Sequence, residues 1–156
     1  MKAPLPLAEA VAIAHEVADH LCPIAQRVMI AGSIRRQKST VGDIDIVVLP
    51  KADGDIAGAL RRLDPAVRGR SYFTLAHRGV QVNVLPTTAA SFGAALLHAT
   101  GSARYNTALR AKAKGLGLKL NQYGLFDSAG RMLAGESEED IYKALGRPRV
   151  RPPDQR

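Results

Sequence analysis

The sequence predicts an α+β fold, because helical and strand patterns of apolar residues alternate along the 156-residue chain. Residues 7–21 place apolar side chains at helical spacing and end before Pro23, which is typical of an amphipathic helix. Residues 41–49 begin with alternation and become wholly apolar, which indicates a strand with a middle buried on both faces. Residues 71–76 and 80–85 indicate two paired strands joined by a tight turn.

Shorter patterns complete the expected elements. Residues 27–31 are a strand candidate that stops at Gly32, and residues 56–63 a short helix. The remaining expected elements are helices at 91–97, 103–114 and 137–145, the last opened by a capping-box pattern, and strands at 118–120 and 123–126. The tail from residue 147 is expected to be extended. A composition shift near residues 87–91 predicts a boundary between lobes 1–88 and 89–156.

The chain is strongly basic, with a formal net charge of +8 and a pI of about 10.1. This charge favours a polyanionic partner such as nucleic acid or a nucleotide, although charge that only maintains solubility is the alternative. No apolar run approaches the roughly 20 residues of a membrane span, so no membrane partner is expected. The lone Cys22 is expected to be a small buried hydrophobe and fits a reducing, cytoplasmic location.

Asp43 and Asp45 are two residues apart in the expected strand, so both carboxylates are predicted to project from one face. Beside Ile44 and Ile46, two charged carboxylates require a cation, and Mg²⁺ suits hard oxygen ligands. Two such ions, about 3.5–4 Å apart, clamp the attacking oxygen and the leaving pyrophosphate in nucleotidyl-transfer sites. The alternative for the pair alone is a surface strand end with two solvated aspartates.

The segment before this pair favours the chemical interpretation. Gly32 lets the backbone approach an anion closely, Ser33 offers a hydroxyl, and the helical turn that follows presents free amides to phosphates. Arg36 adds a forked donor, and Gly42 brings another amide to the same place. A Gly-Ser turn alone is a weak signal. Combined with the aspartate pair, which begins after six intervening residues beyond Arg36, it predicts a nucleotidyl-transfer site.

Three segments together resemble a known family. They are AGSIRRQKSTVGDIDIVV, HATGSARYNTALRAKAKGLGLKLNQYGLF and GESEEDIYKALGRPRVRPPDQR. All three are similar to segments of the family X DNA polymerases, within the polymerase beta-like nucleotidyltransferase superfamily. The resemblance implies a nucleotidyltransferase palm over residues 1–88, with a mixed sheet and helices on one face. It also implies a small α/β thumb-like, nucleotide-selecting lobe over residues 89–156.

The resemblance implies a role for each matching position. Asp43 and Asp45 would hold two Mg²⁺ ions, with Mn²⁺ as a substitute; Gly32, Ser33, Arg36 and Gly42 would bind the triphosphate; Thr100 and Gly101 would form the turn under the sugar; Asn106 would contact the incoming base, and Arg110 and Lys112 the DNA template. The alternative for Asn106 and Arg110 is that both are solvated residues on a helix surface without a functional role. Tyr123 is expected to pack between the lobes.

Asn83 departs from the family pattern. It falls where the resemblance implies a third carboxylate, a metal ligand that helps to activate the primer 3′-hydroxyl. Alternation predicts that Asn83 faces away from Val82 and Val84, with Gln81 beside the site. Asn offers a carbonyl oxygen but cannot act as a base, so nucleotide binding should persist while chemistry is suppressed. An engineered inactive variant is favoured over a naturally silenced binding protein, because the other metal and phosphate positions are intact.

Two further departures concern specificity and DNA binding. His98 and Ala99 stand where many relatives carry an aromatic pair, so weaker rejection of ribonucleotides is expected. The residues before Gly32 are too few for the family's lyase and helix-hairpin-helix segments, which predicts a minimal form. DNA would then be held by basic residues alone, with steep salt dependence and little sequence preference.

The predicted function is that of a template-directed, gap-filling DNA polymerase that adds dNMP from dNTP to a primer by two-metal catalysis, here in an inactive form. The expected partners are primer–template or gapped DNA and dNTP, and the expected state is a monomer. A template-independent terminal nucleotidyltransferase is the alternative within enzymes. A catalytically silent nucleotide- or DNA-end-binding module is the alternative outside them.

Overall fold

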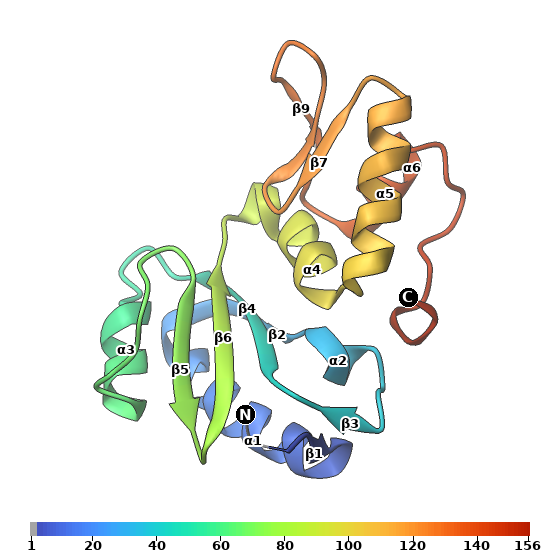
Figure 1. Cartoon of the computed structure of the whole chain (residues 1–156). Coiled ribbons are helices and arrows are strands. Elements are labelled where there is room, and N and C mark those ends of the chain that lie inside the picture. Colours follow the sequence, from blue (N-terminus) through green and yellow to red (C-terminus); the bar gives the residue numbers. More distant parts are fainter. Residues whose placement is uncertain (1–2) are drawn as a thin grey trace.

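A four-stranded sheet in the order β2-β4-β6-β5 forms the first lobe (Figure 1). The structure is a computed structural model that describes residues 3–156. The two central strands are parallel to each other, and both outer pairs are antiparallel. The sheet is therefore mixed, as predicted. Its strands are β2 (Ala25–Ile30), β4 (Ile44–Pro50), β5 (Phe73–His77) and β6 (Val80–Pro86).

The side chains of β4 alternate between two covered faces. Ile44, Ile46 and Val48 pack with the buried sides of α1 (Leu7–Leu21) and α3 (Ile56–Leu63), two helices found where they were predicted. Val47 points to the opposite face and packs against α4 (Phe92–Thr100). Because residues two apart share a face, Asp45 lies on the side of α4. Helices therefore meet both faces, since α4 comes from the second lobe.

The predicted strand over residues 41–49 is interrupted near its start. β3 (Thr40–Val41) pairs with β1 (Leu5–Pro6) in a separate two-stranded sheet, and β4 begins only at Ile44. The placement of Asp43 inside a strand was therefore wrong, because Asp43 lies in the bend between β3 and β4. The direction of its carboxylate is therefore set by this bend and not by strand alternation.

The second lobe packs helices against a three-stranded antiparallel sheet. Figure 1 shows α4 between the first sheet and the rest of this lobe. The core is built mainly of aliphatic residues with Tyr105 and Tyr142. β9 was not predicted, because three residues after a turn give too short a pattern. The elements after α4 are α5 (Ala103–Gly115), β7 (Lys119–Asn121), β8 (Gly124–Phe126), β9 (Met132–Ala134) and α6 (Glu138–Ala144).

Two local predictions were wrong. The tail after α6 folds back and ends in a 3₁₀ turn, η3 (Pro153–Gln155), instead of staying extended, because the Arg156 side chain is buried against Glu138. Cys22 is exposed, since it opens the 3₁₀ turn η1 (Cys22–Ile24) after α1.

An apolar contact joins the two lobes. Ala31 and Val47 of the first lobe pack with Phe92, Ala95 and Leu96 from α4, which follows the 3₁₀ turn η2 (Ala89–Ser91). This contact fixes the second lobe beside the face that carries Asp45. Over residues 3–156, none of the helices combines the length and the apolar character that crossing a bilayer requires.

Candidate active site

Three predicted site positions meet on one face of the first sheet. Asp45 on β4 and Asn83 on β6 are direct register partners in the parallel pair. Asn83 Nδ2 donates to Asp45 Oδ1 and to Asp43 Oδ2, in both cases at 3.1 Å. The bend before β4 therefore brings Asp43 to the same point that the strand gives Asp45.

Asn83 is buried, with 5% of its surface exposed, and its amide has partners on both sides. Its Oδ1 accepts hydrogen bonds from Gln81 Nε2 at 3.1 Å and from Thr74 Oγ1 at 3.3 Å. Gln81 was expected beside the site. Thr74 was not, although it is the register partner of Asn83 across β5 and β6. Only the strand pairing identifies it.

The Asp45 carboxyl is held in an unusual electrostatic environment. Its pKa is raised to about 6, mainly by burial and also by the nearby Asp43 charge, while the hydrogen bond from Asn83 and the charge of Arg36 act in the opposite direction. At pH 7 Asp45 is mostly ionised, and a proton joins it as the pH falls through about 6. A group of this kind favours a cation as neighbour.

The Gly32-Ser33 turn lies directly against this carboxylate. It opens the short helix α2 (Gly32–Arg35), where Gly32 has φ = +58° and an added Cβ would lie 2.2 Å from Asp45 Oδ2. The amide of Ala31 donates to the backbone oxygen of Asp45 at 2.7 Å. The first amide that donates inside the turn is that of Arg35, to Ala31 O at 3.1 Å. The amides just before it are therefore available to an anion beside the carboxylates.

Exchange of Gly32 for alanine is expected to destabilise the fold by about 1–3 kcal/mol, because it adds a Cβ at positive φ and pushes against Asp45. Gly42→Ala is the matched control, since a Cβ there meets nothing within 4 Å. Urea unfolding of both variants measures the difference. Equal unfolding free energies for the two would contradict the close packing of Gly32 on Asp45.

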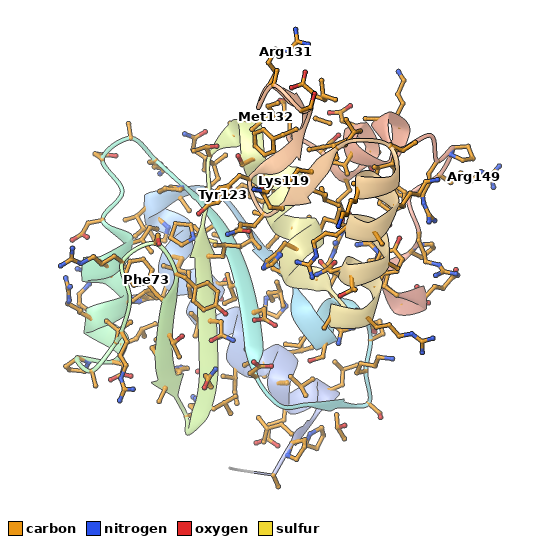
Figure 2. The ribbon with its side chains drawn as sticks, turned by 45° about the horizontal axis from the view of Figure 1, so that its top comes forward. Phe73, Lys119, Tyr123, Arg131, Met132 and Arg149 are labelled. Atoms are coloured by element: carbon orange, nitrogen blue, oxygen red, sulfur yellow. The ribbon has the colours of Figure 1, made fainter. Side chains whose placement is uncertain are left out.

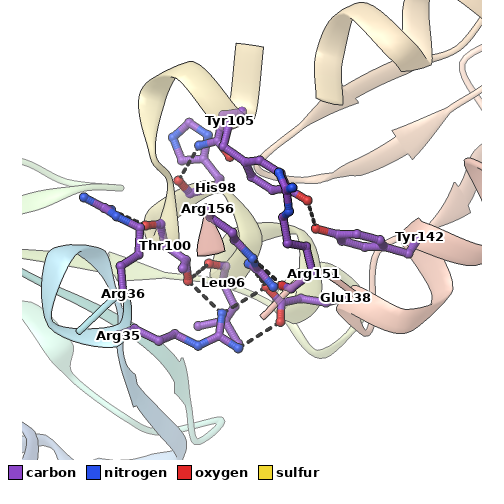
Figure 3. A network of polar contacts seen from close by, with 11 residues as sticks. Arg35, Arg36, Leu96, His98, Thr100, Tyr105, Glu138, Tyr142, Arg151 and Arg156 are labelled. Carbon is purple, nitrogen blue, oxygen red and sulfur yellow. Dashed lines mark hydrogen bonds and ion pairs between the residues drawn. The ribbon is translucent and has the colours of Figure 1, made fainter. Parts of the chain in front are cut away.

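The Thr100-Gly101 turn at the end of α4 reaches the same region from the second lobe. Arg36 Nη1 donates to the backbone oxygen of Thr100, and Gly101, at φ = +67°, leaves the room in which Arg36 lies. The peptide bond between Gly101 and Ser102 is cis. Two of the positions assigned to the sugar are thus linked to one assigned to the phosphates (Figure 3).

A buried ionic cluster links the lobes next to this turn (Figure 3). Arg35 donates to both Glu138 oxygens, at 2.9 and 2.8 Å, and to Thr100 Oγ1 at 2.8 Å. Arg156, with a fully buried side chain, donates to Glu138 Oε1 at 2.7 Å. Sequence reasoning assigned Glu138 only to the start of a helix. Its partners lie 103 and 18 residues away, so no local signal reveals the cluster.

A cavity of about 160 Å³ opens beside the carboxylates. Tyr72, His98 and Ala99 lie on its wall, together with Asp45 and Asn83. Burial and the charges of Asp45 and Asp43 raise the pKa of Tyr72. Tyr72 was missed by sequence reasoning, because it lies in the loop before β5 and belongs to no motif.

The residues assigned to base and template lie on α5. Asn106 Nδ2 donates to the backbone oxygen of His98 at 2.8 Å, and both line a small pocket with Arg110. Burial and the Arg110 charge lower the pKa of His98. Lys112 is exposed on the same helix. The α5 residues therefore border the site without joining it.

The expectation that Tyr123 packs between the lobes was wrong. Its side chain is 57% exposed, and its hydrogen bonds are made by its backbone: its oxygen accepts from Ser91 Oγ at 2.7 Å, and its amide donates to Asn121 Oδ1 at 2.8 Å. Figure 2 shows it among the surface side chains, with Arg131 and Arg149 projecting from the second lobe and the tail. The short turn between β7 and β8 turns the ring outward.

The donor set fits a divalent ion in part. Asp43 and Asp45 supply the hard carboxylate oxygens that Mg²⁺ prefers. Asn83 turns its NH₂ toward them and its oxygen away. Among residues 3–156, no group of three or more His, Cys, Asp or Glu side chains is placed to bind a metal. The residues that would hold an ion are therefore Asp43 and Asp45.

Comparison with known proteins shows which polymerases this chain resembles. Residues 95–156 match the DNA polymerase beta thumb family. DNA polymerase lambda of Rattus norvegicus is 28% identical over 153 residues, which cover 75% of this chain and 26% of the relative. The DNA polymerase/3′-5′ exonuclease PolX of Bacillus subtilis (strain 168) is 27% identical over 162 residues, which cover 94% and 28%. The chain is therefore similar to family X DNA polymerases, with the thumb match confined to its second lobe.

The chain spans about a quarter of the length of these two relatives. Among solved structures it is similar to Leishmania infantum polymerase beta in a ternary P/T complex, with a TM-score of 0.85 and 19% identity, over 99% of this chain and 77% of the other. The ternary gap complex of that protein gives a TM-score of 0.83 and 20% identity, over 99% and 71%. The α+β fold is therefore that of polymerase beta.

Proposed function

We propose that this chain is the nucleotidyl-transfer part of a template-directed DNA polymerase of the gap-filling type. The observation that carries the proposal is the convergence of Asp43, Asp45 and position 83 beside the Gly32-Ser33 turn. Carboxylates next to free helix-start amides suit a metal-bound triphosphate. The Thr100-Gly101 turn, brought in by Arg36, completes the boundary of such a site.

Each group has a role in this proposal. Asp43 and Asp45 would hold Mg²⁺, or Mn²⁺ in its place, which when bound supplies charge neutralisation for the pyrophosphate and a lowered pKa of the primer hydroxyl. Ser33, Arg36 and the amides of Gly32 and Gly42 would orient the phosphates of dNTP. Thr100 and Gly101 would support the sugar, Asn106 would contact the base, and Arg110 and Lys112 would contact DNA.

The residue at position 83 limits the catalytic chemistry that this chain can perform. Asn83 carries no negative charge and cannot accept the proton of a primer hydroxyl as a carboxylate can. Its amide already satisfies both aspartates. This observation favours a second candidate function, a nucleotide- or DNA-end-binding module with silenced chemistry.

A single comparison separates the candidates. The Asn83→Asp protein would be incubated with Mg²⁺ and dNTPs on single-stranded, primed and one-nucleotide-gapped DNA, with the unchanged chain as control. The expected result is extension by the templated nucleotide on the primed and gapped substrates. Untemplated tailing of the single strand would replace the proposal by a terminal transferase. Absence of extension on all three substrates would leave the binding module.

The cavity at Ala99 leads to a prediction about sugar selection. The Asn83→Asp protein is expected to incorporate ribonucleotides within about 10-fold of deoxyribonucleotides, because the small side chain leaves room for a 2′-hydroxyl. Adding Ala99→Phe fills this space and is expected to increase discrimination by about 10- to 200-fold. The ratio of kcat/KM for the two nucleotides measures the effect.

Ala129→Phe, at an exposed turn of the second lobe, serves as the control for an added ring. Strong rejection of ribonucleotides by the Asn83→Asp protein with Ala99 unchanged would contradict the role of the cavity.

A further inference from the structure

We infer that Asn83 is a built-in substitute for a cation: its two N–H groups bridge Asp43 and Asp45, and Thr74 and Gln81 fix that orientation. The inference deepens the proposed function and rests on it only for the identity of the ion, Mg²⁺. It assigns positioning roles to Thr74 and Gln81, which lie outside the three segments that resemble the polymerase family.

The hydrogen bonds around Asn83 define a direction. A side-chain amide has two donors on nitrogen and an acceptor oxygen. Both donors are used on the carboxylates, one on each, at 3.1 Å. The oxygen accepts from Thr74 Oγ1 and Gln81 Nε2, on the side away from the carboxylates. Asn83 therefore presents positive N–H dipoles where a metal ion would present charge.

This orientation opposes metal binding until the amide turns over. With a cation at Asp43 and Asp45, the N–H groups of Asn83 face like charge, whereas its oxygen is a suitable ligand. Rotation by about 180° exchanges the two ends of the amide. The nitrogen then faces Thr74 and Gln81, so both neighbours must accept instead of donate.

Both neighbours are able to make this change. The Thr74 hydroxyl is donor and acceptor alike, and the exposed Gln81 amide can rotate to present its oxygen. The three side chains thus have two fully hydrogen-bonded arrangements, one for each state of the site. A carboxylate at position 83 needs no such change, since it would accept from Thr74 and Gln81 in both states.

The orientation of the amide can be observed directly by NMR. In ¹⁵N-labelled protein without metal, the Asn83 side-chain N–H signals, identified by their loss in Asn83→Asp, are expected to show NOEs to the β-protons of Asp43 and Asp45. With saturating MgCl₂, the NOEs are expected to move to the Thr74 side chain. The Asn121 amide, which is hydrogen-bonded to the turn at Tyr123 through its oxygen, provides an internal reference that should not change.

NOEs from Asn83 to Thr74 in the absence of metal would overturn the inference. An NOE pattern that stays unchanged at an Mg²⁺ concentration that shifts the Asp45 signals would overturn the inference that the Asn83 amide turns over when the ion binds.

Thermal unfolding gives a second, independent readout. The unchanged chain needs no ion to separate its carboxylates, so its Tm is expected to depend weakly on Mg²⁺. Asn83→Asp places three carboxylates together, so its Tm is expected to be lower without metal and to rise steeply with MgCl₂, with at least about 10-fold tighter binding of the ion. Equal metal dependence of the two proteins would overturn the inference. Neither readout uses DNA or dNTP, so a failure of the proposed function leaves both outcomes interpretable.

Discussion

The Asn83→Asp protein is expected to add a templated nucleotide about 100- to 10,000-fold faster than the unchanged chain, the range that a positioned general base contributes. Position 83 is the register partner of Asp45, so the new carboxylate would lie where Asn83 Nδ2 now contacts both aspartates. It would add negative charge for an ion and an acceptor for the proton of the primer hydroxyl. Single-turnover extension of gapped DNA with one dNTP and Mg²⁺ measures the rate.

Two controls identify the origin of the gain. Asn83→Gln keeps an amide in place of the carboxylate and is expected to stay slow. Asn83→Asp combined with Asp45→Asn has the new carboxylate without its partner, and it is expected to return to the low rate. Extension by the unchanged chain at the rate of Asn83→Asp would show that position 83 is not the third carboxylate position.

Glu138→Gln is expected to lower the free energy of unfolding by about 3–5 kcal/mol, the usual cost of removing one partner from a buried ion pair. Glu138 is 7% exposed and bonded to Arg35 and Arg156, so the substitution leaves two guanidinium groups without a charge partner. Urea unfolding at pH 7 measures the loss. Glu139→Gln, a neighbouring exposed position on α6, is the matched control and is expected to be nearly neutral.

The same cluster predicts a pH dependence. Burial alone would raise the pKa of Glu138, but the hydrogen bonds and charges of Arg35 and Arg156 lower it below the ordinary 4.5. The stabilisation is therefore complete above about pH 4.5 and is lost as the pH falls through the lowered pKa of the folded state. The unchanged chain should lose stability in this range, and Glu138→Gln should flatten that part of the curve. Parallel curves for both proteins would contradict the assignment.

The local elements were well determined by sequence pattern. The helices over residues 7–21 and 56–63 have the predicted bounds, because their apolar spacing and flanking stop signals act within one or two turns. The prediction for β4 was less accurate, since the bend at Asp43 depends on the pairing of β3 with the distant β1. The unpredicted β9 depends in the same way on β8 beside it.

The residues of the candidate site also fall into two groups, those predictable from local sequence and those that depend on strand pairing. The residue types of Gly32, Ser33, Asp43 and Asp45, and their short spacing, were sufficient to predict a nucleotidyl-transfer site, because one turn and the start of one strand, with the bend before it, hold them. The hydrogen-bond partners of Asn83 were only partly predictable. Gln81 lies two residues away in the sequence, but Thr74 contacts Asn83 only because of the register between β5 and β6.

The sequence by itself thus determined the chemistry-bearing segment and the family resemblance, which the thumb match and the relatives confirm. Only the tertiary structure decided the direction of the Asn83 amide, the burial of Glu138 between two arginines and the exposure of Tyr123. The physical reason is range. Propensity and periodicity act over a few residues, whereas burial and hydrogen-bond direction depend on groups that the fold brings together from as far as 103 residues away.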